Sequence, residues 1–188
     1  MNKQLVILAL SVFAWFVTPA VYSEPESKNG DPLAPLRFLV GHCWQASFPD
    51  GEHRDTHCFE PFYGKAFVRD RHLVRGPRPD YYGETIYQWD SEAGEIIYRY
   101  WSSTGGVSDG KALPEADRIL FPGEHHVQED GTVLEIRSFM RRVNDSAYQM
   151  ISEQRDGDGW QQLWTMEFSK VGPDNAAGPV QYEQSASD

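Results

Sequence analysis

From residue 42 to residue 169 the chain is a series of short runs rich in Tyr, Trp, Phe, Val, Ile and Thr, separated by turn-forming residues about every 8 to 15 positions. Such runs are typical of antiparallel strands. This pattern leaves room for a helix only before Gly41, where the apolar residues of 33–40 predict one or two helical turns. The predicted strands are 42–48, 54–60, 65–75, 81–90, 95–103, 106–112, 117–121, 125–129, 132–142, 146–155 and 160–169.

The order of these runs predicts the architecture. Nine to eleven antiparallel strands in sequence make a meander, with Pro122-Gly123 interpreted as a turn between two of them. A meander of this length tends to close, because closure removes the two edges that would otherwise recruit other chains. We therefore predict an all-β protein: a single antiparallel meander β-barrel of about 9–11 strands, preceded by a short N-terminal helical turn.

The first 23 residues predict export. Lys3 precedes an apolar stretch at 5–17, and small residues lead to a cleavage position near Ser23, which is the pattern of a secretory signal peptide. A membrane anchor is the alternative, but about 13 apolar residues fall short of the roughly 20 that a spanning helix needs. We expect a periplasmic or secreted protein. Its predicted parts are a signal peptide (1–23), a flexible segment (24–32), the barrel (33–170) and a disordered tail (171–188).

Charge argues against two classes of partner. With 17 basic and 28 acidic side chains, the chain has a formal net charge of −11, and an acidic surface repels phosphate backbones and anionic headgroups. The dense basic stretch from Arg69 to Arg78 alternates as an outward strand face would. We expect no nucleic-acid partner and no stable membrane insertion after signal cleavage. A small apolar or aromatic ligand is the expected partner, and the oligomeric state stays open.

The two cysteines, Cys43 and Cys58, lie in the part predicted to be exported, where an even number of cysteines usually forms bridges. Asp50-Gly51 is a two-residue hairpin turn signal, because a type I′ turn needs positive φ at both central positions. A hairpin closed there sets Cys43 opposite Cys58 at a hydrogen-bonded pair, the wider of the two kinds. We predict a Cys43–Cys58 disulfide; two free thiols, one of them catalytic, are the alternative.

Imidazole and carboxylate side chains share one face of the first strands. The register above places Trp44 opposite His57, on the face that the cysteines do not share. A four-residue loop at 61–64 would then set Asp55 opposite Asp70 on the same face. That inward face holds Trp44, Asp55, His57, Phe59, Asp70 and His72.

Two imidazoles and two carboxylates on an apolar face have three interpretations. They are hydrogen-bonded core groups near a barrel end, a polar floor that orients a ligand, or a general acid–base pair or metal site. These residues match none of the compact spacings of structural zinc sites, so no metal ligands and no cofactor are predicted. No catalytic residue is assigned.

A second candidate lies on the next hairpin. Pairing Asp90 with Glu95 sets Glu84 opposite Trp101 and makes Glu84 a diagonal neighbour of Arg99. An ion pair between Glu84 and Arg99 could hold a polar ligand group inside a cavity. A half-exposed cross-strand pair is the alternative. The predicted ligand-binding residues are thus Trp44, His57, Asp70, His72, Glu84, Arg99 and Trp101.

Four segments carry a resemblance to a known family: 33–44 (LAPLRFLVGHCW), 55–61 (DTHCFEP), 68–76 (VRDRHLVRG) and 100–106 (YWSSTGG). The first resembles the Leu-rich helix and Gly-x-Trp-like entry strand of lipocalin-like (calycin) barrels. Together they resemble exported bacterial proteins of unknown function related to DUF1579-type domains. The resemblance spans residues 33–169 and implies a lipocalin-like barrel, while it says little about activity.

Three functions remain open. The leading prediction is an exported protein that binds a small apolar or aromatic ligand in a barrel cavity. The alternatives are an enzyme that uses His/Asp acid–base chemistry in the same cavity, and an envelope protein-interaction module. The chain has no Gly-x-Ser-x-Gly elbow, phosphate loop or HExxH motif, so the common hydrolase and nucleotide chemistries lack support.

Overall fold

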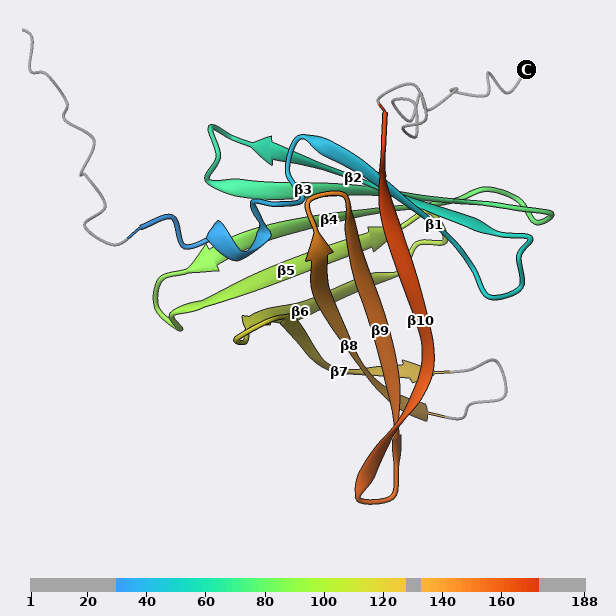
Figure 1. The fold of residues 1–188 in the computed structure, drawn as a ribbon. Helices are drawn as coiled ribbons and strands as arrows, with labels where there is room; N and C mark the ends of the chain where they lie inside the picture. The colour runs from blue at the N-terminus through green and yellow to red at the C-terminus, as the bar shows by residue number, and fades with distance from the viewer. Residues whose placement is uncertain (1–29, 128–132, 173–188) are drawn as a thin grey trace, which may run out of the picture.

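Ten antiparallel strands follow one another around a closed barrel in this computed structural model, which describes residues 30–127 and 133–172 (Figure 1). The predicted signal peptide and most of the two predicted flexible segments lie outside the described residues. The strands are β1 (His42–Ser47), β2 (Arg54–Phe62), β3 (Phe67–Arg75), β4 (Tyr81–Asp90), β5 (Glu95–Ser102), β6 (Val107–Pro114), β7 (Ile119–Val127), β8 (Val133–Asn144), β9 (Ala147–Asp156) and β10 (Gly159–Val171).

The barrel closes between its first and last strands. Each strand pairs with the next along the chain, and β1 pairs with β10 through Cys43 opposite Val171 and Trp44 opposite Lys170. Figure 1 shows β10 lying alongside β1. The prediction of an all-β meander barrel is confirmed, and the ten strands fall within the predicted number.

Strand β7 corrects one predicted boundary. The runs 117–121 and 125–129 were expected to be two strands with a turn at Pro122-Gly123, but residues Ile119–Val127 form one strand. The register with β8 shifts between Phe121 and Glu124. Proline has no N–H to donate to a neighbouring strand, so this dipeptide interrupts the ladder as a bulge and does not reverse the chain.

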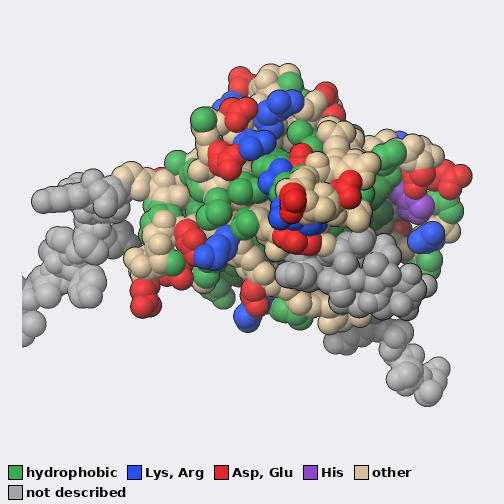
Figure 2. Space-filling model, turned by 90° about the horizontal axis from the view of Figure 1, so that it is seen from below, with side chains coloured by type: hydrophobic (Ala, Val, Ile, Leu, Met, Phe, Trp, Pro, Cys, Tyr) green, Lys and Arg blue, Asp and Glu red, His purple; other side chains and the backbone are tan. Residues whose placement is uncertain are grey.

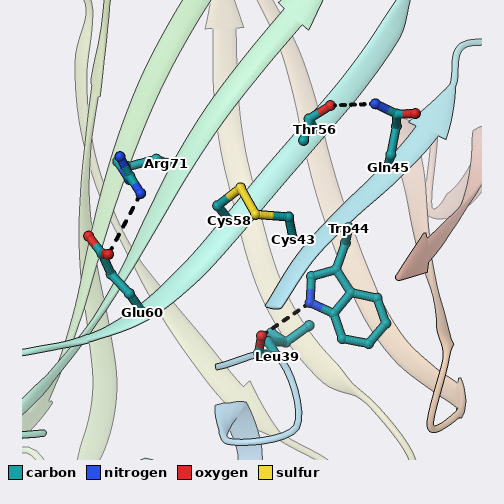
Figure 3. The surroundings of a disulfide bond; sticks show 8 residues. All are labelled: Leu39, Cys43, Trp44, Gln45, Thr56, Cys58, Glu60 and Arg71. Atoms are coloured by element: carbon teal, nitrogen blue, oxygen red, sulfur yellow. Dashed lines mark hydrogen bonds and ion pairs between the residues drawn. A yellow bond between two sulfur atoms is a disulfide. The ribbon is translucent and has the colours of Figure 1, made fainter. Parts of the chain in front are cut away.

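The first hairpin has the predicted register and the predicted disulfide. Cys43 lies opposite Cys58 and is bonded to it, with the two Cα atoms 4.1 Å apart. The turn differs from the prediction: Phe48 N–H donates to His53 O over 2.9 Å, so the loop has four residues where two were expected. The alternation of hydrogen bonds is therefore reversed, and the cysteines occupy the closer, non-hydrogen-bonded kind of pair. Figure 3 shows the bridge on one face of β1 and β2 and Trp44 directed to the other.

The second hairpin has a different register from the predicted one. Pro61 and Phe62 continue β2, and the chain turns at 63–66, where Tyr63 and Lys65 adopt positive φ. As a result Asp55 lies opposite Val74, and not opposite Asp70. The pairing has moved by four residues, an even number, so every side chain stays on its predicted face.

The barrel is filled at one end. A 3-10 turn, η1 (Ala34–Leu36), confirms the predicted helical turn, and Leu36 and Leu39 from this segment pack into the core with Trp44 and Tyr148. Arg37 donates to the Lys65 carbonyl oxygen over 3.0 Å, which places η1 at the barrel end that carries the β2–β3 turn. Within residues 30–127 and 133–172, the chain forms no helix with the length and apolar character that crossing a bilayer requires.

Charged side chains of opposite sign pair on the outer face. Arg69 contacts Glu60 and Glu84 at 3.3 and 2.5 Å, and Arg99 contacts Asp109 at 2.6 Å. Figure 2 shows basic side chains lying beside acidic ones on the face it presents. The arginine-rich stretch of β3 therefore lies partly neutralised on an outward strand face, as its alternation predicted.

Candidate functional site

A cavity of about 370 Å³ occupies the half of the barrel away from η1. Its position follows from its lining, which includes Phe48 beside the β1–β2 turn and Ser108 near the start of β6. Aromatic rings and thioethers form most of the wall, while the imidazole and carboxylate groups gather on β2 and β3 and serine hydroxyl groups lie on β6, β8 and β9. The apolar wall includes Tyr87, Tyr98, Phe121, Met150, Trp164 and Phe168.

The polar side of the cavity is built by β2 and β3. His57 lies directly opposite His72, and their rings stack with centroids 4.3 Å apart and planes 12° from parallel. Asp55 precedes His57 by two residues, so strand alternation puts both on the inward face. We refer to Asp55, His57, Asp70 and His72 as the His/Asp cluster.

Short contacts connect the whole cluster. His57 Nδ1 lies 2.7 Å from Asp70 Oδ2, and His57 Nε2 lies 3.4 Å from Asp55 Oδ1. His72 Nε2 lies 2.8 Å from the same Asp55 oxygen. The two aspartates are buried, whereas the His57 and His72 side chains keep 17% and 16% of their surface accessible. The imidazoles and Asp55 therefore line the cavity, and Asp70 supports His57 from behind.

The electrostatics of the cluster favour one positive charge between the two carboxylates. Burial alone would lower the pKa of His57, but the charges of Asp70 and Asp55, together with the hydrogen bond to Asp70, outweigh burial and raise this pKa well above its usual range. Burial alone would raise the pKa of Asp55, but His57 and His72 hold it well below its usual range. The two carboxylates therefore favour the charged form of His57.

Two tyrosines extend the polar side toward β4 and β5. The Tyr81 ring meets the His72 ring edge-on at 5.7 Å, and the Tyr81 and Tyr100 hydroxyl groups form a hydrogen bond. Burial, followed by this hydrogen bond, raises the pKa of Tyr100. Gly83 makes the arrangement possible, because a Cβ atom there would lie 2.5 Å from the Tyr100 ring.

The predicted site residues fall into three groups. His57 and His72 line the cavity, and Asp70 contacts His57 from behind. Trp44 is fully buried, and its indole N–H donates to the Leu39 carbonyl oxygen over 3.1 Å in the filled half of the barrel. The remaining three, Glu84, Arg99 and Trp101, lie on the outer face.

The expected ion pair between Glu84 and Arg99 does not form. Glu84 contacts Arg69 on β3, and Arg99 contacts Asp109 on β6. The register of β4 with β5 is the predicted one. The prediction of the ion pair failed because it considered only two strands, whereas each of them has a second neighbour that offers a closer partner.

Several cavity residues were absent from the predicted site. Asp55 was placed on the correct face but was not named as a ligand-binding residue, and Tyr100 was given no role in the predicted site. Ser138 and Ser152 share a hydrogen bond of 2.8 Å across β8 and β9 and also line the cavity. Ser138 follows Ile136 by two residues on β8 and Ser152 follows Met150 by two on β9, so a period of two along each strand was the available signal.

The closed antiparallel barrel, with one filled half and one hollow half, is consistent with the lipocalin-like class. No family model matches the chain, and no curated protein is significantly similar to it. The likeness to DUF1579-type proteins therefore remains a prediction from the sequence, and the function must be inferred from the cavity itself.

Proposed function

We propose that the protein binds a small, mainly apolar or aromatic molecule in the barrel cavity. The observation that carries this proposal is a cavity of about 370 Å³ whose walls are mostly aromatic and thioether side chains, with its imidazole and carboxylate groups confined to β2 and β3. This volume lies within the range of small-molecule sites, toward its lower end. A ligand with an apolar body and one polar end matches the distribution of the lining.

Apolar surface supplies the affinity in such a site, and a few polar groups fix the orientation. The Trp164 and Phe168 rings can cover the body of the ligand from β10. His72 and Tyr100 can exchange hydrogen bonds with its polar end from the opposite wall. The polar end is thus expected to be a hydroxyl, carbonyl or amine group.

Export is part of the same proposal. The N-terminal sequence has the pattern of a signal peptide, and the Cys43–Cys58 disulfide is of a kind that persists in oxidising compartments. We infer a periplasmic or secreted binding protein. Separating the cell fractions of its host and sequencing the mature N-terminus tests this inference, which predicts cleavage near Ser23.

Ligand binding is tested with 8-anilinonaphthalene-1-sulfonate, a probe with aromatic rings and one polar end. We expect saturable binding at one probe per chain with quenching of tryptophan fluorescence, since Trp164 lines the cavity. Ser152→Leu adds apolar bulk to the cavity wall and should reduce the affinity by at least about tenfold, because the probe and the new side chain compete for space.

The matched control is Ser47→Leu, the same substitution at an exposed position of β1, which should bind the probe as the wild type does. Native mass spectrometry of freshly purified protein then identifies any molecule retained from the host. Equal affinities of wild type and Ser152→Leu, or no saturable binding at all, would contradict the proposal.

A second candidate is an enzyme that uses acid–base chemistry in the same cavity. It is favoured by His57, which contacts Asp70 with one ring nitrogen and faces the cavity with the rest of its ring. Incubating a recovered molecule with fresh protein separates the two functions: a binding protein returns it unchanged, whereas an enzyme changes its mass.

An interaction module is less well supported. Each of the ten strands in the described part of the chain has a paired neighbour on both sides, although β6 and β7 share only two residue pairs, so no strand there lies at the free edge of a sheet.

A further inference from the structure

We propose that Asp55, His57 and His72 bind one divalent first-row transition metal ion. The site would use a carboxylate oxygen of Asp55 and the Nε2 atoms of both histidines. This inference does not rest on the proposed ligand binding, because the three residues form the site whether or not the cavity holds an organic molecule.

The spacing of the donor atoms matches a metal site. One possible ligand atom from each of the three residues lies within 4.8 Å of the other two. The Asp55 oxygen is 3.4 Å from His57 Nε2 and 2.8 Å from His72 Nε2. Two ligands at about 2.1 Å from one ion lie roughly 3.0 to 3.4 Å apart at octahedral or tetrahedral angles. The observed distances bracket that range.

Two of these atoms also lack hydrogen bonds. Asp55 is only 6% exposed, yet its Oδ1 atom has no hydrogen-bond partner among the described residues, and the same holds for the buried His72 Nε2. Their approach to 2.8 Å does not have hydrogen-bond geometry. Buried polar atoms are normally satisfied, so an unsatisfied pair on a cavity wall indicates a missing partner. A metal ion would satisfy both atoms.

Asp70 supplies the supporting contact that metal-binding histidines usually have. It is 2% exposed, and its carboxylate lies 2.7 Å from His57 Nδ1. With Nδ1–H directed to this carboxylate, the Nε2 lone pair of neutral His57 is available toward Asp55. This carboxylate–histidine–metal arrangement fixes the tautomer and orientation of the ligand.

The charges balance as well. Asp55 and Asp70 bring two negative charges into a largely buried site, and a divalent ion neutralises both. The nearly parallel rings must turn for both lone pairs to meet one ion, and rotation of His72 about χ2 provides this because that torsion is broad.

The donor set indicates the class of metal. Two imidazoles and one carboxylate suit Zn²⁺, Fe²⁺, Co²⁺ or Mn²⁺, whereas Mg²⁺ and Ca²⁺ prefer oxygen ligands alone. Both cysteines of the chain are in the disulfide, so no thiolate competes. Because the three residues line the cavity, the remaining coordination positions face it and are open to water or to the polar end of a ligand.

The test uses the full chain, purified without a polyhistidine tag, stripped with a chelator and dialysed. Zn²⁺ is titrated by calorimetry and Co²⁺ by visible absorption. We expect one ion per chain and Co²⁺ bands typical of nitrogen and oxygen ligands. His72→Gln and Asp55→Asn should lower the Zn²⁺ affinity at least about 100-fold, and Asp70→Asn about 10- to 100-fold.

The matched control is His53→Gln. His53 lies 2.6 Å from Asp50 in the β1–β2 turn, so the two form an imidazole–carboxylate pair without a second histidine. Replacing His53 should leave the Zn²⁺ affinity unchanged. Near-UV circular dichroism reports whether each variant is folded. A second measurement uses the wild type alone: one equivalent of Zn²⁺ should shift the ring NMR signals of two histidines.

Absence of stoichiometric binding, unchanged affinity in folded His72→Gln, or an equal loss in His53→Gln would each overturn the proposal. Probe binding is measured separately. Ser152→Leu should lose the probe and keep the metal, so failure of the metal site and failure of the ligand cavity are distinguishable.

Discussion

At the scale of single residues, Trp44 links the N-terminal turn to the barrel. Its ring is fully buried, its indole N–H donates to the Leu39 carbonyl oxygen over 3.1 Å, and its edge meets the Tyr148 ring at 5.2 Å. A predicted ligand-binding residue is thus placed in the packed core. Its contacts give it a structural role at the filled end of the barrel.

Trp44→Phe should lower the free energy of unfolding by about 2 kcal/mol, because the Leu39 carbonyl loses its buried donor and the smaller ring leaves a void. Urea denaturation measures this change. Trp101→Phe is the control, since Trp101 is 40% exposed on the outer face, and it should change stability by less than about 0.5 kcal/mol. Equal losses in both variants would show that Trp44 has no special role.

At the scale of elements, the disulfide stabilises the hairpin that supports the cluster. It closes a loop of 15 residues between β1 and β2, and it fixes a register in which His57 faces inward. A slip of one residue in that hairpin would turn His57 outward.

Replacing Cys43 and Cys58 with serine should cost about 3 kcal/mol of unfolding free energy, the value expected for a loop of this size. Urea denaturation of the double variant and of the reduced wild type should give similar midpoints. Reductant should not affect the double variant, which serves as the control. A loss under about 1 kcal/mol would mean that the hairpin is held by its other contacts.

The elements also explain what the sequence could and could not predict. The β1–β2 and β4–β5 registers were predictable because Asp50-Gly51 and Gly94 mark their turns. The β2–β3 register was not predictable, because proline is typical of turns, whereas Pro61 here continues strand β2. The predicted set of inward-facing residues was still correct, since a shift by an even number of residues leaves each side chain on the same face.

At the scale of the molecule, the barrel has a packed end and a hollow end. The segment before β1 covers the packed end. An ion pair within this segment stabilises it, with Asp31 Oδ2 2.5 Å from Arg37 Nε. The far walls of the cavity come from β8, β9 and β10. Their residues could not be assigned to the site from the sequence, because only closure of the barrel brings them opposite β2 and β3.

The Asp31 contact predicts a pH-dependent stability. The hydrogen bond from Arg37 lowers the pKa of Asp31 in the folded protein, so its contribution is present above the unfolded pKa and is lost as pH falls through the folded one. The difference in unfolding free energy between wild type and Asp31→Asn should be constant above about pH 5 and shrink toward about pH 2. Urea denaturation across this range measures it, and a difference independent of pH would contradict the assignment.

The pairing of β1 with β10 also governs when the protein can fold. Cys43 lies opposite Val171, so the first strand lacks one of its two neighbours until the last strand has been synthesised. Ribosomes add residues far more slowly than a hairpin forms, so synthesis of β10 sets the earliest time at which the barrel can close. For the exported protein proposed above, the order of the strands means that the chain can still be threaded through a translocation channel as an unclosed chain until β10 is synthesised.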